Sequence, residues 1–196
     1  AFNADTLESL WIYRDPLKGQ PNSPIAYKDG YIYTGFWNGE QKEANLVALS
    51  ATDEDTTNTQ EEKLASWTYN QMGGFYWAGA YVNDNYLLVG TDDGQSGYTS
   101  QTSNLLSINT RTGKVIDQIS GLNADIRSSV SYDKTTDRFY FASKGGSFYS
   151  VKVNADGIID KNSLKSLDLG GMSTSTPVVY NGRAYVGVSG TSQFAA

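Results

Sequence analysis

The stretch Thr176-Pro177-Val178-Val179-Tyr180-Asn181-Gly182-Arg183-Ala184-Tyr185-Val186-Gly187 decides the fold of this chain. Runs of Val, Tyr and Ala flank an Asn-Gly pair, a pattern that predicts two short antiparallel strands joined by a tight turn. Asn and Gly tolerate the positive φ angles that a two-residue primed turn requires. The stretch is therefore expected to form a β-hairpin.

The same pattern occurs three more times along the chain, at residues 23–35, 79–90 and 129–142. The expected turns are Asp29-Gly30, Asn83-Asp84-Asn85 and a longer one over 133–137. We expect positive φ angles in the first two of these turns. Equivalent positions are separated by 55, 52 and 45 residues, namely Gly35, Gly90, Ala142 and Gly187. A period near fifty residues is typical of a four-stranded β-propeller blade.

Each complete repeat also supplies a third and a fourth strand. We expect third strands at 45–49, 104–108 and 147–151, and fourth strands at 65–69, 115–119 and 164–169. The sequence thus predicts an all-β chain with one propeller domain or fragment over residues 1–196. Its four-stranded antiparallel blades fall at about 20–70, 76–121, 127–170 and, incomplete, 174–196, with the innermost strands beginning at Ile25, Tyr81, Val130 and Val178.

Residues 7–14 have fourth-strand character and precede the first blade, so we expect them to complete another blade. Unpaired strand edges invite self-association. We therefore expect either that this strand lies at an outer blade edge near the C-terminal blade, or that two chains share edges. About four blades on their own and four blades of a larger ring both fit the repeats.

The order of these features resembles the PQQ-like (quinoprotein-like) repeat family. The resemblance spans residues 10–188 and is sharpest in 176–187 and in Ser107-Ile108-Asn109-Thr110-Arg111-Thr112-Gly113-Lys114, where Thr-Gly-Lys forms the turn between the outer strands. The Trp that ends each family repeat is present at Trp67, but Asp117 and Leu167 stand at the positions we align with it in the next two blades. The resemblance implies a propeller fold.

Composition excludes several classes of chemistry. The chain has no Cys and no His, which removes thiolate and imidazole nucleophiles, bases and metal ligands. Its net charge of -6 and scattered Lys and Arg residues make nucleic acid an unsuitable partner. No apolar run is long enough to span a membrane, and residues 1–10 do not resemble a signal peptide, so any export signal would lie outside this chain.

The family resemblance raises the alternative of a quinone-dependent dehydrogenase, or of a glycan-active enzyme. Quinone enzymes of this family need calcium, a catalytic carboxylate and aromatic stacking, and no such set can be assembled from the sequence. The loop 154–160 has the centre of a calcium loop without its anchoring carboxylates, so at most one weak surface calcium is expected. The acidic loop 53–62 reads as solvated, and the Gly-rich loop 92–98 lacks the Lys of a phosphate site.

The candidate binding residues are aromatic side chains in glycine-containing connections, where propeller loops reach one face: Phe36, Trp37, Phe75, Tyr76 and Trp77. Flat amphipathic rings suit sugar or peptide surfaces, although they also serve as packing between blades. We expect a non-catalytic module of an exported bacterial protein, secreted, periplasmic or at the cell surface, which binds a protein or carbohydrate partner and needs no cofactor. A structural spacer in a multidomain surface protein is the remaining alternative.

Overall fold

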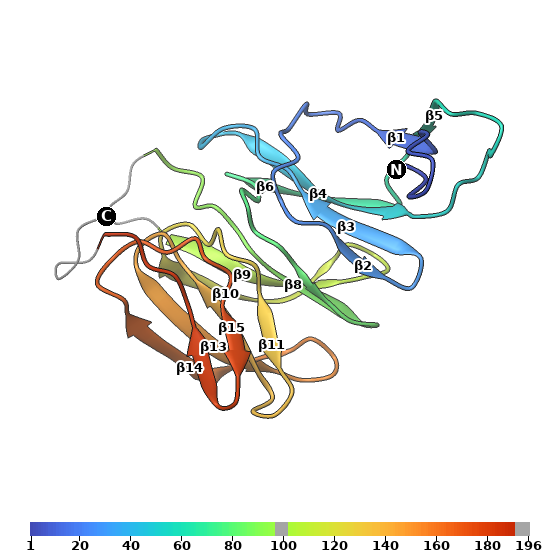
Figure 1. The fold of residues 1–196 in the computed structure, drawn as a ribbon. Helices are drawn as coiled ribbons and strands as arrows, with labels where there is room; N and C mark the ends of the chain where they lie inside the picture. The colour runs from blue at the N-terminus through green and yellow to red at the C-terminus, as the bar shows by residue number, and fades with distance from the viewer. Residues whose placement is uncertain (97–101, 191–196) are drawn as a thin grey trace.

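The computed structural model describes residues 1–96 and 102–190, and it is all-β. Three four-stranded antiparallel sheets follow one another along the chain, each with its strands in sequence order (Figure 1). The first contains β2 (Ala26–Lys28), β3 (Tyr31–Gly35), β4 (Glu43–Ser50) and β6 (Trp67–Met72). The second contains β7 (Tyr81–Val82), β8 (Tyr86–Gly90), β9 (Thr102–Asn109) and β10 (Val115–Asn123).

The third sheet contains β11 (Ser131–Asp133), β12 (Arg138–Ala142), β13 (Ser147–Val153) and β14 (Ile159–Asp168). The Asn181-Gly182 hairpin forms β15 (Val178–Tyr180) and β16 (Arg183–Tyr185), which pair as a two-stranded sheet. β2 contacts β7 and β11 contacts β15, so innermost strands of successive sheets meet. The chain is a β-propeller of about four blades, as the repeats predict; residues 191–196 of the expected last blade lie outside the described part.

The predicted turns are confirmed at two hairpins and differ at a third. Asp29 and Asn181 have φ values of 48° and 49°, and the glycine after each is also positive, as a primed turn requires. No residue of Asn83-Asp84-Asn85 has positive φ. Instead the side-chain oxygen of Asn83 accepts hydrogen bonds from the backbone of Asn85 and Tyr86, an Asx turn that closes the hairpin without left-handed backbone.

Hydrophobic cores lie between the blades. The core between the first and second blades packs Leu46 and Phe75 against Leu87 and Leu106, all at most 1% exposed. Trp67 begins the last strand of the first blade, and its ring lies against Gly113 of the second: a Cβ added to Gly113 would lie 2.6 Å from Cε3 of Trp67. Gly113 has a φ of 69° in the Thr-Gly-Lys turn that joins β9 and β10. The turn is thus shaped to receive the Trp side chain.

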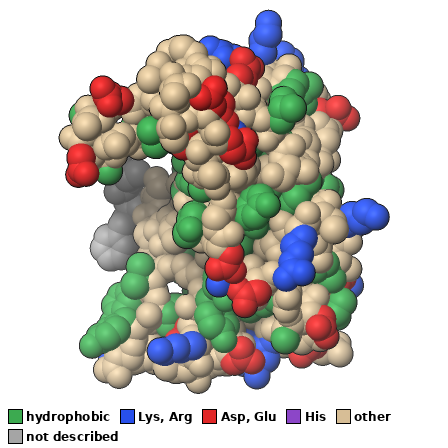
Figure 2. Space-filling model, turned by 90° about the vertical axis from the view of Figure 1, so that its right-hand side faces the viewer, with side chains coloured by type: hydrophobic (Ala, Val, Ile, Leu, Met, Phe, Trp, Pro, Cys, Tyr) green, Lys and Arg blue, Asp and Glu red, His purple; other side chains and the backbone are tan. Residues whose placement is uncertain are grey.

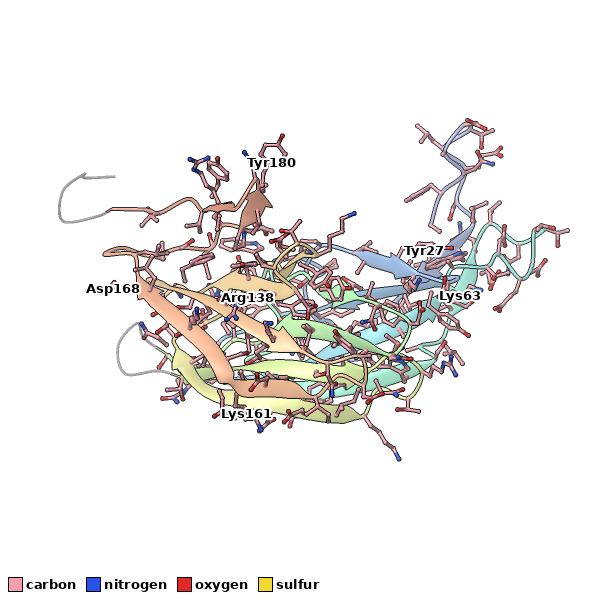
Figure 3. The ribbon with its side chains drawn as sticks, turned by 90° about the horizontal axis from the view of Figure 1, so that it is seen from below. Tyr27, Lys63, Arg138, Lys161, Asp168 and Tyr180 are labelled. Carbon is pink, nitrogen blue, oxygen red and sulfur yellow. The ribbon has the colours of Figure 1, made fainter. Side chains whose placement is uncertain are left out.

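In the second blade, Asp117 occupies the register position of Trp67. Asp117 lies opposite Ser107, as Trp67 lies opposite Ala48 in the first blade. Its carboxylate accepts hydrogen bonds from the backbone N–H of Ile159 and from Lys161 Nζ, both at 2.9 Å, on the next blade (Lys161 is labelled in Figure 3). A polar link therefore replaces the tryptophan contact.

The alignment of Leu167 with this position is wrong. In the third blade it is Lys165 that pairs with Ser150, the equivalent of Ser107, whereas Leu167 pairs with Phe148 and is 61% exposed. The pairing of β13 with β14 contains an irregularity between Ser150 and Lys152. Such irregularities change the spacing along a strand and are not visible as a sequence motif.

The N-terminal strand pairs differently from our expectation. Within residues 7–14, β1 (Trp11–Tyr13) forms a parallel pair with β5 (Glu61–Lys63), which belongs to the long connection between β4 and β6. In Figure 1 this pair lies at the end of the molecule opposite the last hairpin. The expected position near the C-terminal blade is therefore wrong for a single chain.

Backbone hydrogen bonds link neighbouring blades along one face. In each blade, a carbonyl just after the second strand accepts a hydrogen bond from an N–H in the segment that runs on to the next blade. These bonds are Phe75 N to Phe36 O at 2.9 Å, Ile126 N to Thr91 O at 3.0 Å and Ser173 N to Ser143 O at 3.3 Å. Also just after the second strand, a backbone N–H donates to a carbonyl of the segment that enters the same blade. These bonds are Trp37 to Gln20, Asp92 to Gly74, Lys144 to Asp125 and Ser189 to Met172. We call the face formed by residues 36–42, 73–78, 91–96 and 124–130 the loop face.

Candidate functional site

Two of the five candidate residues belong to the core. Phe36 is 6% exposed and Phe75 is fully buried. A Cβ added to Gly35 would lie 2.4 Å from Cβ of Phe75, so this ring is fixed against the first blade. Both residues position the loop face, and we leave them out of the proposed binding surface.

The other three candidates form one stack on the loop face. Trp37 and Tyr76 stack with ring centroids 4.7 Å apart, and Tyr76 and Trp77 with centroids 4.3 Å apart. Trp37 and Tyr76 are partly buried, whereas Trp77 is 45% exposed. The two segments that carry them are held together by the bond between Phe75 and Phe36. Trp77 thus presents its indole to solvent on a support of two further rings.

The backbone of Trp77 is strained. Its φ is 60°, in the left-handed region, which is uncommon for a bulky side chain. Such conformations cost about 1–3 kcal/mol and persist only where the surroundings enforce them. Gly73 and Gly74, which precede the aromatic residues, also have positive φ, so left-handed backbone occurs three times in this short connection.

A cluster of charges adjoins the stack. The guanidinium carbon of Arg127 lies 4.6 Å from the ring centroid of Tyr76. The Nη2 atom of Arg127 contacts carboxylates of Glu40, Asp92 and Asp125 at 3.2, 2.7 and 2.9 Å. Lys144 Nζ pairs with Asp125 at 3.2 Å. We call Glu40, Asp92, Asp125 and Arg127 the charge cluster.

The charge cluster perturbs the ionisation of its buried carboxyl group. Asp92 is fully buried, and this burial raises its pKa to about 8; the Asp125 and Glu40 carboxylates act in the same direction, and Arg127 opposes them. Burial also raises the pKa of the neighbouring Asp93. Asp93 Oδ2 is buried and accepts no hydrogen bond within residues 1–96 and 102–190.

The three carboxylates are close enough together to bind a metal ion, since one oxygen of each lies within 4.8 Å of the others. The guanidinium of Arg127, however, already fills the space between them with direct contacts. A cation there would have to displace Arg127, a residue 5% exposed. The residues therefore fit an internal ion-pair network better than a calcium site.

The loop 154–160 and the acidic loop 53–62 both contain structural contacts. In the loop 154–160, the side chain of Asn154 accepts hydrogen bonds from the backbone of Asp156 and Ile158 and so forms the turn between β13 and β14. Glu54 and Glu61 of the acidic loop pair at 3.1 and 3.0 Å with Lys63, the residue that follows the loop, which is 5% exposed. The expectation of at most one weak surface calcium remains a prediction. Gly97 and Tyr98 of the Gly-rich loop lie outside the described residues.

Sequence reasoning missed the charge cluster. The sequence places Asp92 in the Gly-rich loop 92–98, and it contains no motif that joins this residue to Arg127, Asp125 or Glu40. The internal repeats do contain a signal. By the blade-to-blade bonds, Trp37 and Asp92 are equivalent positions, and Tyr76 is equivalent to Arg127, so the site combines the same positions of neighbouring blades.

Comparison with known proteins supports the fold and does not identify a relative. No protein-family model and no curated protein sequence matches the chain. Among solved structures, the computationally designed Ika8 protein is similar with a TM-score of 0.56 and 10% identity, over 85% of this chain and 42% of that one. BamB from Moraxella catarrhalis gives a TM-score of 0.43 and 12% identity over 82% of this chain. This chain spans 56% of that BamB, so it is shorter than both structures.

No helix of membrane-spanning length and hydropathy occurs among the residues that the structure describes.

Proposed function

We propose that this chain is a non-catalytic β-propeller module of an exported bacterial protein and that its loop face binds a protein or carbohydrate partner. The observation that carries the proposal is the stack of Trp37, Tyr76 and Trp77, which ends in a half-exposed indole on strained backbone. Exposed aromatic rings on a rigid support are typical anchors of binding surfaces. Strain retained at such a residue favours a functional reason for its orientation.

The contact between Trp67 and the Thr-Gly-Lys turn favours repeats of the PQQ-like type. Two other functions remain candidates. A quinone-dependent or glycan-active enzyme is disfavoured because the carboxylates on the loop face are already paired with Arg127 and Lys144. A titration with added quinone and calcium, followed by absorbance and redox activity, tests this alternative. A structural spacer would have no use for an exposed, strained Trp77.

The proposal is tested by binding to a panel of oligosaccharides and peptides, with the variants Trp77→Ala and Trp37→Ala. Tyr180→Ala is the matched control, because Tyr180 is 73% exposed and belongs to the last hairpin, from which it projects outward (Figure 3). We expect Trp77→Ala to weaken binding of the best ligand at least about tenfold, as removal of a hot-spot aromatic does. Wild-type binding by both Trp variants would contradict the proposal, whether or not the Tyr180→Ala control loses binding.

A further inference from the structure

Negative charge exceeds positive charge around the aromatic stack. Three carboxylates contact Arg127, and Asp93 lies beside Asp125, to which its backbone N–H donates a hydrogen bond at 3.0 Å. Arg127 and Lys144 are the described cations in direct contact with these groups. The loop face carries the four carboxyl groups of Glu40, Asp92, Asp93 and Asp125 against the two cations Lys42 and Arg127, with Lys144 beside Asp125. The side chain of Glu40 is 37% exposed, so part of this excess faces solvent.

The buried cation of the site is not available to an external anion. Arg127 is 5% exposed and already contacts three carboxylates and the Tyr76 ring. The side chain of Glu40 is 37% exposed and that of Arg127 is 6% exposed, so a phosphate or carboxylate has more access to Glu40 than to Arg127. The electrostatics therefore disfavour anionic ligands at this face.

A cation, by contrast, finds both of the groups that it prefers. The ring of Tyr76 already carries a guanidinium 4.6 Å from its centroid, which shows that the stack accommodates a cation on an aromatic face. Trp is the aromatic side chain that binds cations best, and Trp77 is the exposed ring of the stack. The Glu40 carboxylate supplies a charge-assisted hydrogen-bond acceptor on the same loop face. The net charge of the whole chain, -6, favours encounter with a basic partner.

We propose that the loop face recognises a Lys or Arg side chain on an exposed segment of a partner protein, with the cation on the indole of Trp77 and with Glu40 as the solvent-facing carboxylate of the charge cluster that attracts it. This inference rests on the proposed function and selects a basic protein segment over a carbohydrate as the partner. A neutral sugar would use the ring of Trp77 but would leave the excess of carboxylates without a role.

The experiment uses three synthetic peptides with the same Gly-Ser spacing, which carry lysine, Nε-acetyllysine or glutamate. Binding is followed by calorimetry at low and physiological ionic strength, and by NMR of the indole N–H groups of the four tryptophans. We expect the lysine peptide to shift the Trp77 resonance and to bind more weakly as salt increases, because exposed ion pairs are screened. Acetyllysine and glutamate peptides should bind at least about fivefold more weakly, because they lack the cation and therefore the cation–π contact.

The variants Trp77→Ala and Glu40→Gln should each weaken binding of the lysine peptide about threefold to tenfold. Glu62→Gln is the matched control, since Glu62 is 57% exposed and pairs with Arg14 at the β1–β5 pair. Urea unfolding of each variant checks that the fold is retained. Glu40→Gln keeps an oxygen for Arg127, so its effect reports charge rather than loss of the cluster.

The possible outcomes separate the two proposals. Equal binding of the lysine and acetyllysine peptides, or Trp77-dependent binding of a neutral oligosaccharide alone, would overturn the inference and leave the binding function of the loop face intact. Binding of the lysine peptide that is insensitive to Trp77→Ala would place the cation site elsewhere and would overturn the inference. A Trp77 resonance that no peptide or sugar shifts would overturn both proposals.

Discussion

The indole Nε1 of Trp67 donates a 2.7 Å hydrogen bond to the backbone carbonyl of Thr110, across the boundary between the first and second blades. Trp67 is 8% exposed and also packs on Gly113, three residues further along the same turn. One side chain therefore contributes both a buried hydrogen bond and the packing of its ring to the contact between blades.

Trp67→Ala should lower the free energy of unfolding by about 3–5 kcal/mol, as truncation of buried aromatic residues does. Trp67→Phe keeps much of the packing and loses the bond to Thr110, so we expect a smaller loss of about 1–2 kcal/mol. Urea unfolding followed by circular dichroism measures both values. Equal losses in the two variants would show that the hydrogen bond, and not the ring, dominates the contact.

Gly113→Ala should destabilise the protein more than Gly121→Ala. Both glycines have positive φ, 69° and 78°, so both substitutions introduce the same backbone strain. A Cβ at Gly121 meets no atom within 4 Å, whereas one at Gly113 would overlap the ring of Trp67. Urea unfolding of both variants therefore isolates the contact with Trp67; equal destabilisation would mean that the ring moves away at no cost.

Stability should fall as pH rises from about 5 to about 8.5. Asp92 has a folded-state pKa raised to about 8, above the value of about 3.9 expected when unfolded, so the folded state binds more protons in this window. The chain has no His, which leaves Asp92, Asp93 and the N-terminal amine as the main groups involved. The lowered pKa of the amine acts in the opposite sense. Asp92→Asn should flatten the profile, measured by urea unfolding at several pH values; a wild-type profile that rises with pH would contradict the pKa shift.

Trp77→Gly should be at least as stable as Trp77→Ala, by up to about 1 kcal/mol, because glycine adopts the φ of 60° without strain and alanine does not. Tyr180 provides the comparison, since it lies in β15 and glycine weakens strands. There Tyr180→Gly should be the less stable of the pair. Thermal unfolding of all four variants gives the two differences, and the same sign at both sites would argue against strain at Trp77.

The chain should self-associate through the last hairpin. Val178, Tyr180 and Tyr185 are each more than half exposed and share one face, because Val178 lies opposite Tyr185. At the other end, a hollow of about 560 Å³ lies beside Trp11, Phe36 and Leu49, and Figure 2 shows separate groups of hydrophobic side chains on this side. Sedimentation velocity should therefore show concentration-dependent association that Val178→Ser with Tyr180→Ser reduces. A monomer at all concentrations would show that these faces tolerate exposure.

The sequence predicted the blades well because their signals are local. Turn residues such as Asp29-Gly30 and alternating strands specify a hairpin within a dozen residues, and the repeat of that signal specifies a propeller. Pairings that depend on long connections were missed. Nothing near Trp11 indicates that it pairs with Glu61, fifty residues away, and the irregularity near Lys152 changes which residue of β14 faces Ser150.

The candidate site was half predicted for a similar reason. Clustered aromatic residues such as Tyr76 and Trp77 are visible in a sequence, although their burial is not. Phe75 is fully buried, whereas Trp77, two positions later, is 45% exposed. Arg127 stands alone among small polar residues. Its importance arises only when the first blade, the second blade and the connection to the third bring Glu40, Asp92 and Asp125 around it.

The hydrogen bonds that join the blades along the loop face run between backbone atoms, so they do not depend on which side chains the bonded residues carry. Trp37 and Asp92 occupy equivalent positions in neighbouring blades, and one is an aromatic ring where the other is a carboxylate, while the backbone bonds at the two positions are the same. Duplication of a blade copies the frame, and later substitution diversifies what it displays. For an engineer, the same property makes the partly buried residues 37 and 76 suitable for randomisation in a library, because the backbone bonds around them do not depend on their side chains.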